Sequence, residues 1–331
     1  MHAPAVTVTV IALCYNHERF VLDCLESIRA QTFQDFELIV TDDCSRDRSP
    51  QLIADWLAAH YPRARFIRHT ANRGICATLN EALAAARGTY VSMIATDDVW
   101  LPHKLSSQVR LAQSLDAGTA VVYGDAEQMD EAGNLLPDGF IAAHHVNDPP
   151  SGAVFGRLAS GNFIPAMATL IRRDALQAVG GYDERLSYED FDMWLRLADR
   201  YAFAFQPEVV ARYRIVATSM VRTVFAQPSP WHQHTNFLIR QKWLRSRKLT
   251  RAQRTLWADQ MWRAAYGLFV HHDPRAAACL WTAFRYSGRP RAAALALACG
   301  LGVTRTRLVV LRQAAADLVG GILGRFRGKA N

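Results

Sequence analysis

The feature that most constrains this chain is the alternation of short apolar runs with amphipathic stretches over its first hundred residues. Residues 6–13 (VTVTVIAL) and 36–40 (FELIV) are apolar and rich in β-branched side chains, which is typical of buried strands. Between them, residues 18–31 carry apolar side chains three and four positions apart, as on one face of a helix. Strands alternating with helices of this length favour βαβ units and a parallel sheet.

The same alternation continues toward the middle of the chain. Further helices are predicted at residues 51–60, 74–86, 102–115, 174–179 and 189–200. Further strands are predicted at residues 66–67, 90–94, 120–123, 203–205 and 209–213. Residues 125–165 are rich in turn-forming Gly, Pro and Asn, and we expect a long loop over a site there.

Charge divides the chain into two parts. Residues 231–331 hold 18 Lys or Arg against three Asp, a net charge of +15, whereas residues 1–230 carry a net charge of −7. A Gln-Pro-Ser-Pro hinge at 227–230 precedes the basic part. We therefore expect an α/β domain over residues 1–225 and a basic helical region over residues 231–331. The six cysteines form no CxxC or CxxH pair, which argues against a zinc ribbon or a thioredoxin-type site.

The basic region predicts an anionic partner. Residues 301–312 and the surroundings of Phe326 mix apolar and cationic side chains, which suits a helix lying in an anionic membrane surface. No run of about 18 apolar residues is present and no signal peptide is recognised, so we expect a cytoplasmic protein, peripheral on the inner membrane. A solvated cationic face over an ordinary helical core is the alternative, and no nucleic acid partner is expected.

Two acidic pairs follow predicted strands of the same sheet. Asp42 and Asp43 come after the strand at 36–40, and Asp97 and Asp98 come after the strand at 90–94. Each pair by itself also suits a turn or a helix N-cap. Carboxylates gathered at one sheet edge repel one another unless a cation or a donor joins them. Because Mg²⁺ and Mn²⁺ prefer oxygen ligands and bind diphosphates, the edge predicts a metal-bridged nucleotide diphosphate.

A third acidic element opens the predicted helix at 189–200. Glu189 and Asp190 lie at its start, where the helix dipole favours anions. One interpretation is a helix cap. The functional interpretation is a carboxylate that faces the cleft and acts as a general base.

Three blocks of the sequence, taken together and in order, resemble glycosyltransferase family 2, a group of inverting enzymes with the GT-A fold. The resemblance covers roughly residues 5–215. The blocks are VTVTVIALCYNHERFVLDCLESIRAQTFQDFELIVTDDCSRDRS, NRGICATLNEALAAARGTYVSMIATDD and VGGYDERLSYEDFDMWLRL. The resemblance implies a Rossmann-like, mostly parallel sheet flanked by helices, and transfer of a sugar from a nucleotide diphosphate, by default a UDP-sugar.

The resemblance also implies roles for individual residues. Asp42 is expected to hydrogen-bond the nucleobase, and Asp97 to coordinate the divalent cation, Mg²⁺ or Mn²⁺. Asp190 is expected to deprotonate the acceptor hydroxyl, with Glu189 orienting it. Further nucleotide or donor contacts are expected from Cys14, Tyr15, Asn16, Glu18, Asp43, Arg73, Gly74 and Asp98. Acceptor contacts are expected from Asn162 and Tyr188.

The chain departs from the family pattern at two positions. Cys44 stands where the DDGS block has Gly, and Ala95 stands where the first acid of the DxD motif is common, so we expect a weaker metal requirement. The Gln-x-x-Arg-Trp block of processive synthases is absent, which predicts transfer of one or a few sugars per encounter.

The sequence thus predicts an inverting enzyme with a glycan or lipid-linked glycan acceptor, in bacterial cell-surface polysaccharide biosynthesis. Two other functions stay open. A sugar-nucleotide nucleotidyltransferase also uses an α/β sheet and Mg²⁺, but it would need a Gly-rich basic loop after the first strand. A non-enzymatic protein that binds anionic surfaces would depend on the basic region alone.

Overall fold

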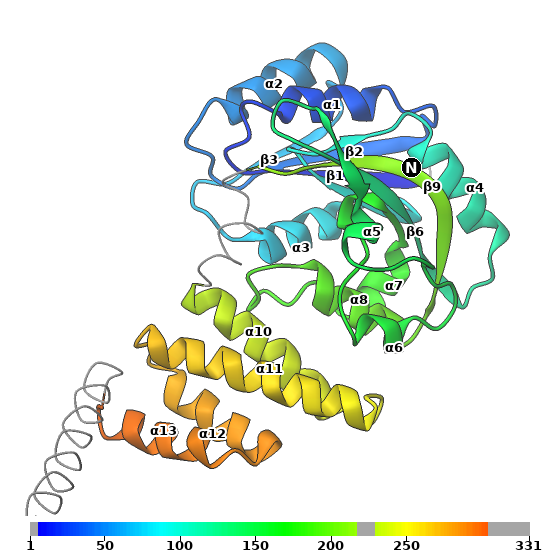
Figure 1. Cartoon of the computed structure of the whole chain (residues 1–331). Coiled ribbons are helices and arrows are strands. Elements are labelled where there is room, and N and C mark those ends of the chain that lie inside the picture. The colour runs from blue at the N-terminus through cyan, green and yellow to red at the C-terminus, as the bar shows by residue number, and fades with distance from the viewer. Residues whose placement is uncertain (1–5, 217–228, 304–331) are drawn as a thin grey trace, which may run out of the picture. The chain divides into compact units, whose positions relative to one another are not determined.

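The computed structural model of the chain describes residues 6–216 and 229–303. They belong to two compact units, one within residues 1–223 and the other within residues 224–331 (Figure 1). Most of the sequence predicted to lie in a membrane surface, and the first half of the predicted hinge, fall outside the described residues.

The described part of the N-terminal unit is built on a nine-stranded sheet with the order β3-β2-β1-β4-β8-β6-β9-β5, and β7 pairs with β6. Its first half is parallel, with β1 between β2 and β4. These strands are β1 (Val8–Cys14), β2 (Phe36–Asp42), β3 (Arg65–Arg68) and β4 (Tyr90–Ala95). Their carboxyl ends therefore meet at one edge, where open α/β sheets bind ligands.

The second half of the sheet is mixed. β8 lies antiparallel between β4 and β6, and β6 pairs in parallel with β9. Its strands are β5 (Val99–Trp100), β6 (Thr119–Met129), β7 (Leu135–Gly139), β8 (Thr169–Arg172) and β9 (Ala202–Arg214). The sheet thus continues beyond β4, and β9 returns to the carboxyl edge beside the acidic pair that follows β4.

Helices cover both faces of the parallel half, with α1 and α2 on one face and α3 on the other (Figure 1). Alternate β1 residues such as Val10 and Ala12 pack into one core with Val21, Leu25 and other residues of α1 and α2. The helices of the unit are α1 (Val21–Arg29), α2 (Ser49–His60), α3 (Ile75–Ala85), α4 (Lys104–Ser114), α5 (Phe140–Ala143), α6 (Phe155–Leu158), α7 (Arg173–Ala178) and α8 (Asp190–Ala198), with a 3₁₀ turn at Ala166–Ala168.

The predicted α/β fold class is confirmed, but the second half of the unit differs in detail. The expected loop at 125–165 contains the end of β6 together with β7, α5 and α6. β9 is one strand where two were predicted, and β5 and β8 were not predicted. These short strands are stabilised by pairing with distant segments, which local periodicity does not reveal.

The described C-terminal unit is helical, as predicted. It consists of α10 (Pro230–Leu244), α11 (Arg251–Val270), α12 (Ala276–Ser287) and α13 (Pro290–Gly300). Thr250 and Gln253 form a capping box at the start of α11, and Trp257, Met261 and Leu268 bury one face of that helix. Within the described residues, none of the helices combines the length and the apolar character needed to cross a bilayer.

Candidate active site

Two loops at the carboxyl edge are held to each other by side chains. The backbone N–H of Asn16 donates to Ser45 Oγ at 2.8 Å, and the Arg46 N–H donates to Asn16 Oδ1 at 2.8 Å. Glu18 Oε2 accepts from the backbone N–H of Arg48 at 2.9 Å. Asn16 and Glu18, both predicted donor-binding residues, thus hold these two loops together. Tyr15 stays 45% exposed beside them.

Asp42 ends β2 and is completely buried. Its Oδ1 accepts a hydrogen bond from the backbone N–H of Ser45 at 3.0 Å. Its Oδ2 is buried and has no hydrogen-bond partner among residues 6–216 and 229–303. A buried acceptor without a partner costs about 1–3 kcal/mol, so such an atom calls for a specific explanation.

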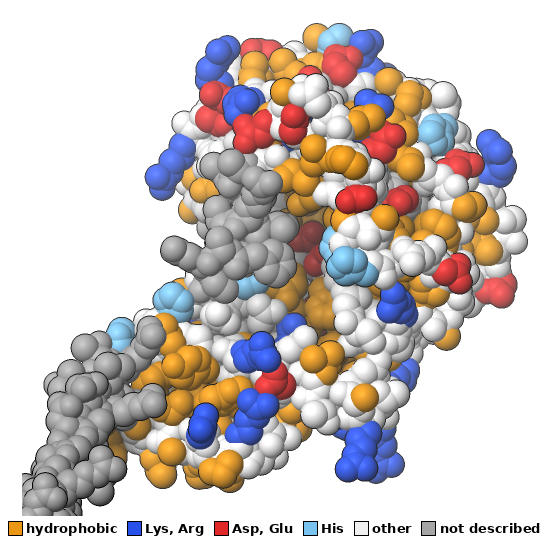
Figure 2. All heavy atoms as spheres, in the orientation of Figure 1, with side chains coloured by type: hydrophobic (Ala, Val, Ile, Leu, Met, Phe, Trp, Pro, Cys, Tyr) orange, Lys and Arg blue, Asp and Glu red, His pale blue; other side chains and the backbone are white. Residues whose placement is uncertain are grey.

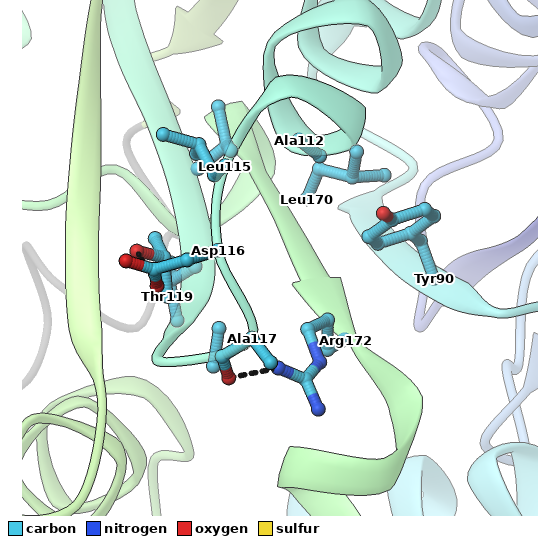
Figure 3. Close-up of a pocket in the computed structure, with 11 residues that line it drawn as sticks. Tyr90, Ala112, Leu115, Asp116, Ala117, Thr119, Leu170 and Arg172 are labelled. Carbon is cyan, nitrogen blue, oxygen red and sulfur yellow. Dashed lines mark hydrogen bonds between the residues drawn. The ribbon is translucent and has the colours of Figure 1, made fainter.

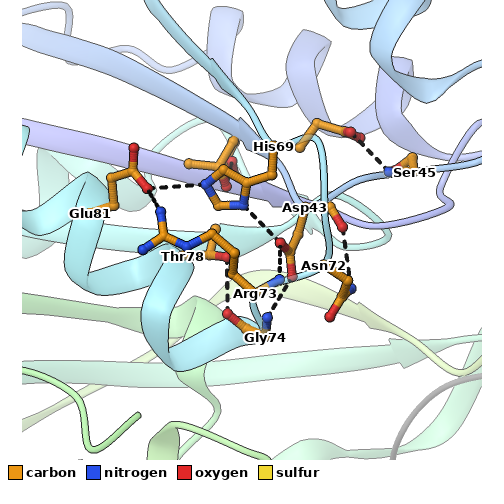
Figure 4. A network of polar contacts seen from close by, with 11 residues as sticks. Asp43, Ser45, His69, Asn72, Arg73, Gly74, Thr78 and Glu81 are labelled. Atoms are coloured by element: carbon orange, nitrogen blue, oxygen red, sulfur yellow. Dashed lines mark hydrogen bonds and ion pairs between the residues drawn. The ribbon is translucent and has the colours of Figure 1, made fainter.

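Asp43 is the centre of a polar network that holds the loop between β3 and α3 (Figure 4). Its carboxylate accepts from the backbone N–H groups of Arg73 at 2.8 Å and Gly74 at 2.9 Å. His69 Nδ1 lies 2.8 Å from the same carboxylate, and its Nε2 lies 3.1 Å from Glu81. The Arg73 guanidinium pairs with Glu81. A direct contact of Asp43 or Arg73 with a nucleotide stays a prediction, and both side chains already hold this loop.

The backbone after β2 takes an unusual conformation at Cys44. Its φ of +67° lies in the left-handed region, as does the φ of +58° at Asn16. Glycine adopts this region without strain, whereas most other residues do not. The conformation that the family's glycine would favour is therefore retained here at Cys44. Gly74, with a φ of +82°, begins α3 in a conformation that requires glycine.

The residues after β4 meet the loop after β1 through His17. The His17 ring places Nδ1 2.9 Å from Thr96 Oγ1 and Nε2 3.7 Å from Asp97 Oδ2. The Asp97 side chain is 14% exposed and that of His17 is 23% exposed, so both are open to a ligand. His17 is not among the residues for which the sequence predicts a role, although Asn16 and Glu18 on either side of it are.

Asp98 faces the protein interior. It is 2% exposed, and its Oδ1 accepts from the backbone N–H of Arg214 at the end of β9, at 2.9 Å. Burial raises the pKa of Asp98, and the neighbouring Asp97 raises it further. The Arg214 guanidinium donates to the carbonyl of Asp97 at 2.8 Å and lies over the Phe20 ring, 4.7 Å from its centroid. This geometry favours an anchoring role for Asp98, and its predicted contact with the donor stays a prediction.

Asp190 is the first residue of α8, and its carboxylate is held by two donors. Asn162 Nδ2 donates to Oδ2 at 2.6 Å, and the backbone N–H of Phe191 donates to Oδ1 at 2.5 Å. Burial raises the pKa of Asp190, while these two donors act in the opposite direction. The structure therefore brings together Asn162 and Asp190, which the sequence assigned to the acceptor side and to catalysis.

Glu189 directly precedes Asp190 at the start of α8, and the charges of the two carboxyl groups interact. Burial, followed by the charge of Asp190, raises the pKa of Glu189 to about 8. The raised pKa favours the protonated form of Glu189, and because the two charges interact, the two carboxyl groups titrate together. Tyr188 precedes this pair and is half-buried. Cys14, at the end of β1, is buried, and burial raises the pKa of its thiol to about 11, so it is not a nucleophile.

A divalent cation at this edge would need ligands beyond the protein. Within residues 6–216 and 229–303, no three His, Cys, Asp or Glu side chains are grouped so that they could hold a metal ion. Ala95 offers no ligand, and Asp98 is engaged with Arg214. Asp97 is the carboxylate that stays available. Because Mg²⁺ is commonly bound by one or two carboxylates together with substrate phosphates, Asp97 fits a cation that a diphosphate helps to hold.

A cavity of about 260 Å³ lies at the other edge of the sheet (Figure 3). It is lined by Tyr90 at the start of β4, Thr119 at the start of β6, and Arg172 at the end of β8. Arg172 is paired with Asp174 and with the carbonyl of Ala117. This cavity is separate from the acidic carboxyl edge and contains none of the predicted site residues.

Several curated proteins are similar to this chain in sequence. An uncharacterized glycosyltransferase of Rickettsia prowazekii is 27% identical over 225 residues, which are 66% of this chain and 67% of that protein. Three longer Rickettsia relatives are matched over about a third of their length.

Solved structures share the fold. S. aureus TarS 1-349 in complex with UDP-GlcNAc matches with a TM-score of 0.64 and 17% identity, over 93% of this chain and 92% of that one. The mannosyltransferase PcManGT of Pyrobaculum calidifontis, in complex with GDP-Man and Mn²⁺, matches with a TM-score of 0.56 and 19% identity, over 95% and 86%. The model of the family "Glycosyl transferase family 2" matches residues 9–180, more than half of the chain. The chain is therefore a glycosyltransferase and belongs to family 2.

Proposed function

We propose that this enzyme transfers a sugar from a nucleoside diphosphate, by default UDP, to an acceptor hydroxyl with inversion at the anomeric carbon. The observation that carries the donor assignment is the buried Oδ2 of Asp42, which has no hydrogen-bond partner in the part of the chain that the structure describes. A carboxylate oxygen only accepts hydrogen bonds, so the missing partner is a donor. The ring N–H of uracil, thymine or guanine is such a donor, whereas cytosine presents an acceptor at the matching position.

The other nucleotide contacts follow from the same edge. Tyr15, 45% exposed beside the loop of Asp42, offers a flat surface for the base. Two structural neighbours support a nucleotide-sugar donor, since TarS is solved with UDP-GlcNAc and PcManGT with GDP-Man. Asp97 would hold Mg²⁺ or Mn²⁺ together with the two phosphates, and the cation would neutralise charge that develops on the leaving diphosphate.

The transfer step needs a base near the acceptor. In our proposal, the Asp190 carboxylate removes the proton of the acceptor hydroxyl while the oxygen of that hydroxyl bonds to the anomeric carbon. The bond from that carbon to the diphosphate oxygen breaks, and the nucleoside diphosphate leaves. Asn162 holds Asp190 in place, and the raised pKa of Glu189 favours its protonated form beside the Asp190 carboxylate. A single displacement of this kind inverts the sugar.

Nucleotide titration calorimetry tests the donor assignment. The protein with Mn²⁺ is titrated with UDP, dTDP, GDP and CDP, and the same titrations are made with Asp42→Ala. We expect the best nucleotide to be one with a ring N–H, and we expect Asp42→Ala to weaken it about tenfold or more. Tightest binding of CDP, or equal binding by Asp42→Ala, would refute the role of Asp42. Slow hydrolysis of a panel of sugar nucleotides then identifies the sugar.

The acceptor side is also part of the proposal. We place the acceptor among glycans or lipid-linked glycans of bacterial surface polysaccharides, with residues 1–225 as the catalytic domain. The nucleotidyltransferase alternative lacks support at the loop after β1, where Asn16 and Glu18 bind backbone N–H groups and no Gly-rich basic loop is present. Release of UDP from a UDP-sugar, rather than diphosphate from a nucleoside triphosphate, distinguishes the two.

We further propose that residues 231–331 bind an anionic membrane surface. The described residues 229–303 hold twelve Lys or Arg against two Asp. Large apolar side chains lie exposed among them, including Leu256 at 44%, Trp281 at 41% and Leu297 at 63%. On the C-terminal unit, apolar patches adjoin Lys and Arg side chains (Figure 2). Each cation near such a surface contributes about 1 kcal/mol.

Liposome co-sedimentation tests this part independently of catalysis. Binding is expected with anionic vesicles, weaker as salt is added, and lost when residues after Gly288 are removed. Equal sedimentation with neutral and anionic vesicles would overturn it.

A further inference from the structure

A divalent cation at this site needs a protein ligand in addition to Asp97. Ala95 replaces the acid that often precedes Asp97 by two positions, and the Asp98 carboxylate accepts from Arg214. A cation bound by Asp97 and diphosphate alone would have a single protein ligand. A second donor atom close to Asp97 would supply the ligand that Ala95 does not.

The His17 ring has the required position. Its Nε2 lies 3.7 Å from Asp97 Oδ2, which is longer than a hydrogen bond. Metal–nitrogen and metal–oxygen bonds of about 2.0–2.2 Å would place two ligand atoms of one ion about this far apart at an open ligand angle. The side chains of His17 and Asp97 are 23% and 14% exposed, so a diphosphate and water can complete the coordination.

The other ring nitrogen of His17, Nδ1, already has a hydrogen-bond partner in the protein. Nδ1 lies 2.9 Å from the hydroxyl of the buried Thr96. When Nδ1 carries the ring proton and donates to Thr96, Nε2 presents its lone pair toward Asp97. Histidines that bind metals commonly have such a partner on the second nitrogen, because it sets the tautomer and the ring orientation.

A second histidine with the same separation from a carboxylate shows why the arrangement at His17 is distinctive. His103 Nε2 also lies 3.7 Å from a carboxylate oxygen, that of Glu208. That nitrogen, however, lies 3.1 Å from the carbonyl oxygen of Val209, so it carries a proton and has no lone pair to offer. His103 and Glu208 are therefore a matched control pair.

We propose that His17 Nε2 and the Asp97 carboxylate are both protein ligands of the divalent cation. In this proposal, His17 takes the place of the acid that is common in the family at the position of Ala95. This inference rests on the proposed binding of a metal–diphosphate complex at Asp97. An imidazole ligand favours first-row transition metals over Mg²⁺, whose sites are built from oxygen. The site should accordingly prefer Mn²⁺ or Co²⁺ to Mg²⁺, and His17→Gln should reduce that preference.

Pulsed electron paramagnetic resonance of bound Mn²⁺ tests the ligand directly. The full chain is loaded with Mn²⁺ and UDP, or GDP if UDP does not bind, and electron spin echo modulation from a directly bound ¹⁴N is recorded. We expect this ¹⁴N signal in the wild type and in His103→Gln, and its loss in His17→Gln. Mn²⁺ affinity in the presence of nucleotide should fall about tenfold or more in His17→Gln. It should also fall in Thr96→Val, because His17 Nδ1 then loses its hydrogen-bond partner.

The outcomes separate this inference from the proposed function. Two results would overturn the role of His17 alone: Mn²⁺ binding that requires Asp97 but gives no ¹⁴N signal, or a ¹⁴N signal that persists in His17→Gln. In either case, His17 and Asp97 form only an ordinary ion pair. Failure of the wild type to bind Mn²⁺ with either nucleotide overturns the metal site itself. Circular dichroism of each variant confirms that a lost signal does not come from unfolding.

Discussion

Asn162 Nδ2 lies 2.6 Å from Asp190 Oδ2, and this hydrogen bond joins the loop after α6 to the first residue of α8. The amide can only donate through this nitrogen, so it stabilises the ionised carboxylate. The charge of Asp190 interacts with three further titratable groups, namely Glu189, His144 and Tyr182. Burial favours the protonated form of Asp190, whereas the hydrogen bonds from the Phe191 N–H and from Asn162 oppose it, with a smaller electrostatic contribution from His144.

Asn162→Ala should shift the pH dependence of transfer. Without this donor the pKa of Asp190 rises further, so the base is protonated over a wider pH range. The acidic limb of kcat/KM should move upward by about one pH unit, since a hydrogen bond to a charge contributes about 1.5–3 kcal/mol and one unit equals about 1.4 kcal/mol. Activity at neutral pH falls, and activity at high pH recovers.

The chain contains a matched control for Asn162. Asn134 Nδ2 donates to Asp130 Oδ2 at 2.9 Å in the exposed turn between β6 and β7. Asn134→Ala removes a similar pair and should leave the pH profile unchanged. A uniform loss of activity in Asn162→Ala, with the same pH limb, would mean that Asn162 acts only in folding.

Asp190→Asn should separate activity from stability. Loss of a general base costs about 10²–10⁴ in rate, whereas UDP affinity should stay within a few-fold. Because the pKa of Asp190 is raised, its ionised form is less favourable in the folded than in the unfolded chain, and the neutral amide should leave Tm equal or higher. Steady-state kinetics and a thermal melt measure both. Transfer near the wild-type rate would show that Asp190 is only a helix cap.

Lys104→Met should stabilise the protein. Lys104 is completely buried, and its Nζ is bound by Ser92 Oγ and by the carbonyl of Thr169 without a carboxylate. Burial lowers the pKa of Lys104, so its charged form is less favourable in the folded chain than in the unfolded chain. Ser92 also donates to the Thr169 carbonyl at 2.6 Å, so that bond survives the substitution.

The pH dependence of this gain gives its cause. Between its lowered pKa in the folded chain and its pKa of about 10.4 in the unfolded chain, the unfolded lysine binds more protons than the folded one, so wild-type stability rises with pH over that interval. The advantage of Lys104→Met, measured as the difference in Tm, should therefore shrink from pH 7 to pH 10. A constant difference would show that packing, and not charge, is responsible.

Cys44→Gly should also raise stability, by about 0.5–1 kcal/mol. The left-handed conformation of Cys44 costs a residue with a Cβ about 1–2 kcal/mol, and the greater freedom of glycine in the unfolded chain offsets part of the gain. Asn16→Gly is the contrasting variant. Asn tolerates this region, and its Oδ1 accepts from Arg46, so that substitution should destabilise. Urea titrations compare the two, and a loss of stability in Cys44→Gly would contradict the strain.

The sequence alone determined the parallel half of the sheet. The spacing of apolar residues over a few positions predicts a buried strand at residues 6–13 and a helix whose buried face contains Val21, Cys24, Leu25 and Ile28. The structure confirms these elements as β1 and α1. Acids placed after such strands must meet at one edge, because parallel strands share their direction. The order of residues along the chain therefore places Asp42 and Asp97 at that edge.

Only the tertiary structure decided what each side chain at that edge touches. Asp42 and Asp43 are neighbours in the sequence, yet one keeps a buried oxygen without a partner and the other holds Arg73 and Gly74. His17 reaches Asp97 across 80 positions of the chain, and Asn162 reaches Asp190 across 28. The physical reason is that periodicity reports which face of an element is buried, whereas hydrogen bonds between loops depend on where distant backbone segments are brought together by packing.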